Sequence, residues 1–354
     1  MIDVEPHRDA YLAALHSGER REAIDVALAL LQNGVSAEQV VTELLAPAQA
    51  EVGLGWQEGR WSVAMEHRAS GITESALQAV VYRALSAPGA IHEGSLGHVV
   101  IACSESEWHV LPGRMAAEFL RLRGADVTFV GPSVPADELG GFLGGAPPAV
   151  VAVTCSMPMS LVGAWRSISS LRAIGMSVVC GGRGFGTDGR WGLALGADLW
   201  APDFAAGADM LLSLADGPAP APREPAGAPG RIGEVRVLAR DHDTLVEGAS
   251  QIAFSRWPGM RHSDAALRAT RDDLSFTLKV IASATLVDDL ALVTDHVRWF
   301  EAVLAGHGLP LAFVPSAFEL LLSVLPTDLT FSRDAARWGS QVCSESSLRS
   351  DYFS

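Results

Sequence analysis

The sequence predicts a mixed fold class, α/β plus all-α, in which an N-terminal helical bundle, a doubly wound α/β domain and a C-terminal helical domain follow one another. Two Pro- and Gly-rich breaks, Leu85–Gly97 and Ala215–Gly233, divide the 354-residue chain. The first and third segments carry apolar residues at helical spacing, whereas short apolar runs alternate with helical ones in the second. We therefore expect domains at residues 1–86, 97–216 and 233–354.

The composition narrows the class of protein. A net charge of −15 disfavours direct binding to nucleic acid, where affinity comes from neutralising phosphates. No apolar run reaches the length of a membrane span and no leader pattern opens the chain, so we expect a cytoplasmic protein with no membrane contact. The wide spacing of the four cysteines favours free thiols over a disulfide framework or a zinc site.

Three helices are expected in the first segment. Residues 19–34 and 36–56 carry apolar side chains at helical spacing, and the second of these stretches opens on a capping box at Ser36. It also contains Pro47, where we expect a kink. A further helix begins after Ser62.

Aromatic and ionisable residues gather at one end of this bundle. Trp56 ends one expected helix, and Glu66 and His67 lie in the first turns of the next, so a short loop brings all three to the same end. The structural alternative is a hydrophobic contact beside a carboxylate that the helix dipole favours. The functional alternative is a cluster that faces a ligand outside the bundle.

The second segment contains five short apolar runs, expected to form a flavodoxin-like, doubly wound, five-stranded parallel sheet. They are residues 98–103, 127–131, 149–156, 177–182 and 197–202. In this topology ligands bind beyond the carboxyl ends of the strands, at the switch point between the first and third. The loops at that edge are therefore the candidate site.

The loop after the first strand carries a histidine with a nearby carboxylate. His109 follows Glu107 by two residues and precedes a helix that we expect Pro112 to open. A carboxylate at this spacing can hold one imidazole nitrogen and leave the other for a metal.

The loops after the third and fourth strands add small groups at the same edge. Thr154 and Ser156 offer hydroxyls to a buried polar ligand, and Gly181 and Gly182 would let a ligand approach the backbone. A single loop histidine is usually solvated. Three such features on one edge indicate a binding site.

Glu107-x-His109, Ser156 and Gly181-Gly182 resemble the cobalamin-binding signature. The resemblance implies that His109 replaces dimethylbenzimidazole as the lower axial ligand of cobalt, and that the nucleotide tail enters the sheet beside the hydroxyls. Two positions differ, because Glu107 stands where the signature usually has aspartate and Pro112 where it usually has glycine.

Trp56 followed after nine residues by Glu66-His67 resembles the helical cap of the adenosylcobalamin photoreceptors. The resemblance implies that Trp56 covers the adenosyl group and that the Glu-His pair lies over the upper face. In the repressor-type members a histidine that captures cobalt follows the tryptophan, but this chain has Gln57, which leaves His67 or no residue for that role. Because the bundle begins near Met1, we expect no N-terminal DNA-binding module.

Together the two resemblances imply the following cofactor-binding residues: Trp56, Glu66, His67, Glu107, Trp108, His109, Val134, Thr154, Ser156, Gly181, Gly182 and Phe185.

The third segment is expected to be helical, with helices over residues 274–308 and 309–325, the second interrupted by Pro315. Upstream lies a cationic stretch that contains Arg256, Trp257, Arg261, His262, Arg268 and Arg271. One interpretation is a solvated helix face with internal ion pairs. The other is an anion site in which aromatic side chains stack against an extended, carboxylate-bearing chromophore.

The order of these segments resembles the photocobilins, light sensors that bind both cobalamin and biliverdin. The resemblance implies a bilin site in the third segment, with these candidates: Arg256, Trp257, His262, Arg268, Arg271, His296 and Trp299. The two histidines fit a structural role equally well. We expect non-covalent attachment, because the one cysteine of this segment, Cys343, lies in a polar tail that we expect to be mobile.

The leading hypothesis is a light sensor that uses adenosylcobalamin, and biliverdin as second chromophore, rather than an enzyme. Photolysis of the cobalt–carbon bond would change the domain arrangement and the assembly of a homo-oligomer, and so signal to a protein partner. One alternative is a corrinoid methyl-carrier module of a methyltransferase system, which also joins a helical cap to this fold. Another is a flavodoxin-like scaffold with an unrelated ligand. A mutase is poorly supported, because a substrate barrel typically takes about 250 residues and none remains in this sequence.

Overall fold

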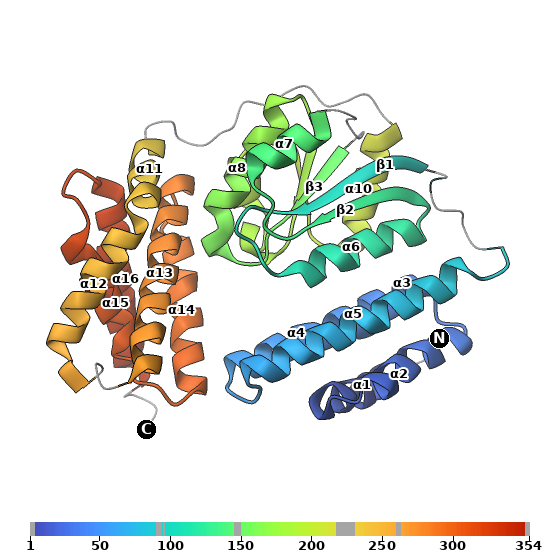
Figure 1. Cartoon of the computed structure of the whole chain (residues 1–354), viewed down its shortest axis with the longest axis horizontal. Helices are drawn as coiled ribbons and strands as arrows, with labels where there is room; N and C mark the ends of the chain where they lie inside the picture. The colour runs from blue at the N-terminus through green and yellow to red at the C-terminus, as the bar shows by residue number, and fades with distance from the viewer. Residues whose placement is uncertain are drawn as a thin grey trace. The chain divides into compact units, whose positions relative to one another are not determined.

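The computed structural model describes residues 4–89, 94, 96–144, 150–216, 231–259 and 263–350 (Figure 1). The chain divides into two compact units, residues 1–156 with 163–225 and residues 157–162 with 226–354. The expected mixed class, α/β plus all-α, is confirmed. The first unit holds both the N-terminal helices and the sheet.

The N-terminal helices form a bundle around a continuous apolar core. They are α1 (Glu5–Ser17), α2 (Arg20–Gln32), α3 (Ala37–Gln39), α4 (Ala46–Gln57) and α5 (Val63–Leu85). Ser36 and Gln39 form the expected capping box, and Ser62 caps α5 by accepting from the N–H of Met65 at 3.3 Å. At the centre, Tyr11 is fully buried, and burial raises its pKa to about 12.

Pro47 does not kink the helix in the expected way. A π-helical turn, Val40–Leu45, joins α3 to α4, and Pro47 falls on the second position of α4. The wider turn changes the hydrogen-bond pattern just before the proline, which has no N–H to contribute. The chain is therefore helical without a break from Ala37 to Gln57.

The sheet has the predicted topology. Strands β1 (Leu96–Cys103), β2 (Ala125–Gly131), β3 (Val150–Thr154), β4 (Val178–Gly181) and β5 (Leu199–Ala201) are all parallel, in the order β2-β1-β3-β4-β5. Their register aligns Cys103, Thr154, Gly181 and Ala201 in one row. This row is the carboxyl edge at which the sequence predicts a site.

Helices cover both faces of the sheet: α6 (Val110–Leu122), α7 (Ala136–Gly144), α8 (Leu161–Ala173), α9 (Arg190–Ala194) and α10 (Phe204–Asp216). The last of these packs with α6 on one face, and α6 also contacts α5 of the bundle (Figure 1). Pro112 does not open α6, because the helix begins at Val110 with His109 as its N-cap. A third helical position tolerates proline, since the first N–H groups of a helix have no internal partner.

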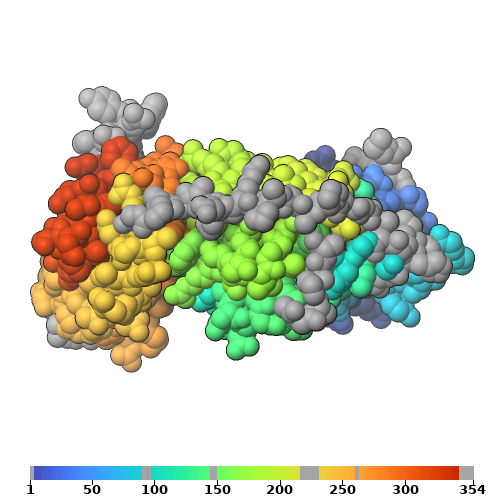
Figure 2. Space-filling view, turned by 90° about the horizontal axis from the view of Figure 1, so that it is seen from above, coloured from blue at the N-terminus to red at the C-terminus, as the bar shows by residue number. Residues whose placement is uncertain are grey.

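The second unit is entirely helical in the described residues: α11 (Ile232–Arg240), α12 (His242–Arg256), α13 (Asp264–Val287), α14 (Ala291–Gly306), α15 (Phe313–Val324) and α16 (Thr330–Ser350). The orange and red surfaces in Figure 2 belong to helices of this unit. No described helix of either unit combines the length and the apolar character that crossing a bilayer requires.

Two expectations for this unit were wrong. The run 274–308 is not one helix, because Asp288 adopts a left-handed conformation, φ +55°, that ends α13. Pro315 does not interrupt a helix, because it lies in the first turn of α15, where it costs no hydrogen bond. The backbone at Cys343 belongs to α16, which runs to Ser350.

Candidate functional site

A buried carboxylate holds the histidine that precedes α6. Glu107 is 1% exposed, and its Oε1 accepts from the backbone N–H of His109 at 2.9 Å and meets the ring Nδ1 at 2.6 Å. Its Oε2 accepts from the N–H of Ser156 at 2.8 Å. Glu107 therefore ties the loop after β1 to the loop after β3, and Nε2 is the imidazole nitrogen left for a metal.

The two groups shift each other's ionisation. Burial raises the pKa of Glu107, but the hydrogen bond and charge of His109, with two backbone N–H donors, outweigh burial and lower it. The hydrogen bond to Glu107 raises the pKa of His109, burial opposes the rise, and the charges of Glu107 and Glu66 add to it. The carboxylate is thus ionised and orients the imidazole, whose side chain is 58% exposed.

The influence of Glu66 on His109 links the cap to the loop after β1. Glu66 lies on α5, and its two oxygens are held by different partners. Oε2 lies 2.6 Å from Nδ1 of His67, and Oε1 accepts from the Ser70 hydroxyl at 2.8 Å. Ser70 in turn accepts from Nε2 of Gln49 on α4 at 2.6 Å. The cap therefore presents a fixed carboxylate within electrostatic range of His109.

The two tryptophans of the cap motif have different environments. Trp61 is 5% exposed and meets the His16 ring edge-on, with centroids 5.1 Å apart. A Cβ at Gly55 would collide with the Trp61 indole, so this glycine is required by packing. Trp56 is only half-buried, at the C-terminal end of α4. Trp61 is therefore structural, whereas Trp56 retains surface that a ligand can contact.

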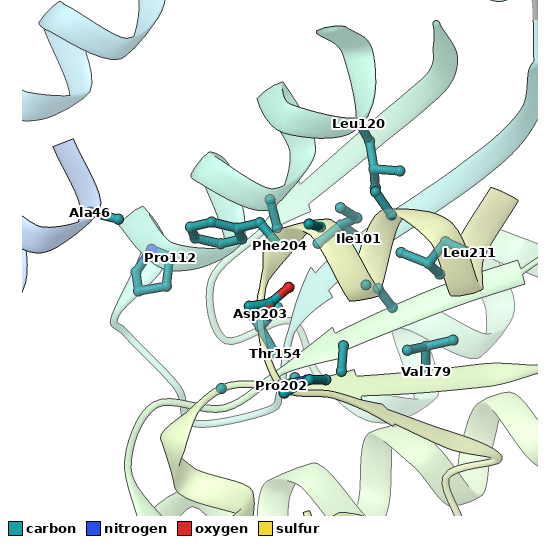
Figure 3. A pocket seen from close by; sticks show the side chains of 18 of the residues that line it. Ala46, Ile101, Pro112, Leu120, Thr154, Val179, Pro202, Asp203, Phe204 and Leu211 are labelled. Carbon is teal, nitrogen blue, oxygen red and sulfur yellow. The ribbon is translucent and has the colours of Figure 1, made fainter. Parts of the chain in front are cut away.

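A cavity of about 710 Å³ lies between the sheet, α6, α10 and α4 (Figure 3). It contains four of the expected binding residues, namely Thr154, Ser156, Gly181 and Gly182. Its full lining is Thr42, Ala46, Pro47, Ala50, Ile101, Pro112, Ala116, Leu120, Ala152, Thr154, Ser156, Val179, Cys180, Gly181, Gly182, Ala201, Pro202, Asp203, Phe204, Ala205, Gly207, Ala208 and Leu211.

One hydroxyl in this cavity lacks a hydrogen bond. Thr154 Oγ1 is buried, and no described residue forms a hydrogen bond of full geometry with it. The weakly polar thiol of Cys103 lies beside it. Buried polar atoms in proteins are normally satisfied, so an exception needs an explanation. A ligand whose polar atom reaches Thr154 would supply one.

The glycine pair serves two purposes. Gly182 has φ +106°, and a Cβ there would collide with the Cys155 carbonyl, so its own chain requires glycine. Gly181 has open space in front of it, with Ala201 no closer than 3.8 Å to a Cβ. Only Gly181 thus leaves room for a ligand at the cavity wall.

Several lining residues escaped the sequence analysis. Thr42, Ala46, Pro47 and Ala50 bring the cap to the cavity, and no sequence motif marks them. Gly113, in the first turns of α6, does not line the cavity but packs against it, since a Cβ there would lie 3.0 Å from Thr154 Oγ1. The sequence offered one signal for Gly113. It directly follows Pro112, which stands where the cobalamin-binding signature usually has glycine.

Other expected residues lie outside the cavity. Phe185 is fully buried against Gly192, so it belongs to the core of the α/β domain. Trp108 is 73% exposed, and Val134 is half-buried in the loop after β2. Trp56, Glu66 and His67 likewise do not line it. The cavity and the cap motif are therefore separate parts of the candidate site.

The cationic residues of the second unit do not converge on one anion site in the described structure. Arg256 pairs with Glu319 at 3.4 Å and lies over Trp257, and Arg271 pairs with Glu247 at 3.0 Å. Arg268 is exposed, and His262 lies outside the described residues. These contacts match the alternative of a solvated helix face with internal ion pairs.

His296 and Trp299 lie in an aromatic cluster of the same unit. The His296 ring is 5.8 Å from Trp299, 5.6 Å from Phe300 and 6.3 Å from Phe318, centroid to centroid. Burial lowers the pKa of His296 to about 4, so the imidazole is neutral at pH 7. Its Nε2 lies 3.5 Å from Thr277 Oγ1.

Two segments of the chain match known family models. Residues 7–80 and residues 97–207 each match a model described as B12 binding domain. The chain thus carries two B12-binding domains. Among its described residues no group of three or more His, Cys, Asp or Glu side chains is arranged to hold a metal ion.

Individual proteins resemble parts of the chain. The HTH-type transcriptional repressor CarH of Myxococcus xanthus is 32% identical over 142 residues, which are 39% of this chain and 45% of CarH. The chain therefore spans less than half the length of this curated relative.

Solved structures resemble the chain to different degrees. The monomethylamine corrinoid protein of Methanosarcina barkeri has a TM-score of 0.51 and 16% identity, over 60% of this chain and 100% of that chain. The methanol:cobalamin methyltransferase complex MtaBC of the same organism gives a TM-score of 0.31 and 19% identity, over 61% of this chain and 83% of that one.

Proposed function

We propose that this chain is a light sensor that binds adenosylcobalamin between the cap and the α/β domain of its first unit. The observation that carries the proposal is the buried Glu107 carboxylate, which holds Nδ1 of His109 and leaves its Nε2 at the carboxyl edge of the sheet. The match to B12-binding domains and the similarity to CarH support it.

Each residue has a role in this proposal. Nε2 of His109 would bind the cobalt, and Glu107 holds the imidazole through Nδ1. The cavity beside Thr154 and Gly181 receives the nucleotide tail. Trp56 would cover the adenosyl group, and the same cap carries the Glu66 carboxylate that Ser70 and His67 hold in place. When bound, the cofactor supplies a cobalt–carbon bond that light can break.

The deciding experiment is an absorption spectrum of the purified chain mixed with adenosylcobalamin, recorded in the dark and after green light. We expect a bound spectrum in the dark, with a histidine rather than dimethylbenzimidazole as the lower ligand, and a defined change after illumination. A mixture with the spectrum and the photolysis products of free adenosylcobalamin would contradict the proposal.

We further propose that the output is a change of assembly rather than catalysis. The chain would form a homo-oligomer whose state differs in the dark and in the light, and this difference would be detected by a protein partner. Size-exclusion chromatography with light scattering on the adenosylcobalamin-loaded chain tests this idea. One molar mass in both conditions would rule out light-dependent assembly.

A corrinoid methyl carrier is the alternative function. The fold shared with the monomethylamine corrinoid protein favours it, since that chain is matched over its whole length. A carrier, however, leaves Trp56 and the second unit without a role. The two functions predict different upper ligands: a carrier binds methylcobalamin at least as well as adenosylcobalamin, whereas the lid over the sensor site favours the adenosyl form.

The bilin component is a separate part of the proposal, placed in the second unit. The aromatic cluster around His296 supports it, because such faces can cover a tetrapyrrole. Purified chain mixed with biliverdin should then show a red or far-red band that denaturation releases. The absence of that band in the native mixture would refute bilin binding, and pigment retained after denaturation would refute non-covalent attachment.

A further inference from the structure

We infer that the cavity of the first unit selects corrinoids by their lower base, taking an apolar benzimidazole in preference to a purine such as adenine. The inference rests on the proposed function, in which the nucleotide tail enters this cavity. It concerns which corrinoid the chain accepts, and it follows from the chemistry of the cavity walls.

The deep walls of the cavity are apolar. Ile101, Ala152 and Val179 form the floor on the sheet and are exposed by 0, 8 and 2%. Leu120 of α6 and Leu211 of α10 close the sides (Figure 3). The volume of about 710 Å³ falls within the range of about 300–1,000 Å³ typical of small-molecule sites.

Polar groups are few and most are already engaged. Among the described residues that line the cavity there is no Lys, Arg, His, Asn or Gln. The Asp203 carboxylate caps α10 by accepting from the N–H of Ala206 at 2.8 Å, and the N–H of Ser156 donates to Glu107. The hydroxyls of Thr154 and Ser156 are the side-chain groups that remain, and Thr154 Oγ1 is buried without a hydrogen bond of full geometry. The side chains of the wall can thus satisfy about two polar atoms of a buried base.

The two bases differ in what they would leave unsatisfied. A dimethylbenzimidazole presents an apolar ring with two methyl groups and one free ring nitrogen, which the Thr154 hydroxyl can serve. Adenine adds an amino group and further ring nitrogens, which would lose water without gaining partners. Sites that lack partners for buried polar groups discriminate against ligands that carry them. We expect the adenine-base corrinoid to bind at least about tenfold more weakly.

The test compares three adenosyl corrinoids in the dark on the full chain: adenosylcobalamin, its adenine-base analogue, and adenosylcobinamide, which has no nucleotide. Dissociation constants come from absorbance titration and calorimetry. We expect adenosylcobalamin to bind most tightly, ahead of the adenine analogue by at least about tenfold. Equal affinity for the two bases would overturn the inference while leaving the proposed function intact. Failure of all three to bind would overturn both.

A matched pair of variants on β4 assigns the preference to the cavity. Val179 lines the cavity and Val178 does not, although both are buried neighbours whose side chains leave opposite faces of the sheet. Val179→Thr adds a hydroxyl of the same shape to the wall and should reduce the preference for dimethylbenzimidazole. Val178→Thr should leave the ratio of dissociation constants unchanged. Equal shifts in both variants would show a global effect and overturn the inference.

Discussion

His109 is the residue on which the metal assignment depends. In the structure its Nδ1 is held by Glu107, so the free Nε2 is presented at the carboxyl edge of the sheet. Replacing His109 with alanine removes the proposed lower ligand. We expect His109→Ala to bind adenosylcobalamin more weakly and to give a base-off cobalt spectrum, as measured by absorbance titration in the dark.

A second histidine, on the strand that precedes the His109 loop, provides the control for this variant. His98 lies on β1, where its Nε2 meets the Thr128 hydroxyl at 3.0 Å, and it does not line the cavity. His98→Gln should therefore leave the cobalt spectrum unchanged. If His109→Ala also keeps the parent spectrum, the lower ligand is not His109.

The two tryptophans of the cap should respond differently to truncation. Trp61 is nearly buried against His16 and Gly55, so Trp61→Ala should lower the free energy of unfolding by about 3–5 kcal/mol. Trp56 is half-buried, and Trp56→Ala should cost less stability but let methylcobalamin bind as well as adenosylcobalamin. Urea unfolding and corrinoid titration of both variants measure this. An unchanged preference for adenosylcobalamin in Trp56→Ala would contradict the lid.

At the scale of elements, one carboxylate joins two helices of the second unit. Glu234 of α11 accepts from the N–H of Ser332 at 3.0 Å, from its hydroxyl at 2.8 Å and from the N–H of Phe331 at 3.3 Å. It therefore caps the start of α16 from outside that helix, where the dipole favours negative charge. We expect Glu234→Ala to lower the free energy of unfolding by about 1–2 kcal/mol in urea denaturation.

Glu247 offers a matched comparison in the same unit. It pairs with Arg271 at 3.0 Å, but both side chains are more than two-fifths exposed. Exposed ion pairs contribute about 0–1 kcal/mol, so Glu247→Ala should change stability little. A larger loss in Glu247→Ala than in Glu234→Ala would contradict the capping role.

At the scale of the whole molecule, His296 should make the second unit sensitive to acid. Burial lowers the pKa of His296 from 6.5 to about 4, so the unfolded chain binds a proton that the folded chain does not as pH falls through this window. Stability is lost on acidification from pH 7 to 4, by up to about 3 kcal/mol. The midpoint of the urea unfolding transition of the second unit should therefore move to lower urea concentrations as the pH falls. This is the transition that Glu234→Ala is expected to shift.

Asp273 acts in the opposite direction over an overlapping range. Burial, with the charge of Asp272, raises the pKa of Asp273 to about 6, so the folded chain takes up a proton first and gains stability on acidification. Because Asp273 is present in both chains, comparison with His296→Gln cancels this effect. The stability difference between parent and variant should shrink from pH 7 to 4. Parallel pH profiles would exclude His296 as the source.

The sequence by itself determined the order of elements, the sheet topology and the edge that carries the site. Parallel strands joined by helices allow few arrangements, so the apolar runs were enough to place Thr154 and Gly181 in one row. Local signals were also sufficient for the capping box at Ser36 and the helix start at Ser62. The spacing of Glu107 and His109 indicated their hydrogen bond before its geometry was known.

Only the tertiary structure decided which residues meet. Thr42 and Ala50 line the cavity because the cap folds onto α6 and α10, and no periodicity carries that information. Phe185 follows the glycine pair closely in sequence but turns into the core, because the turn after Gly182 directs it there. Arg256 and Arg271 form ion pairs with glutamates on other helices. Spacing along a chain predicts neighbours within one element, whereas contacts between elements depend on how their surfaces pack.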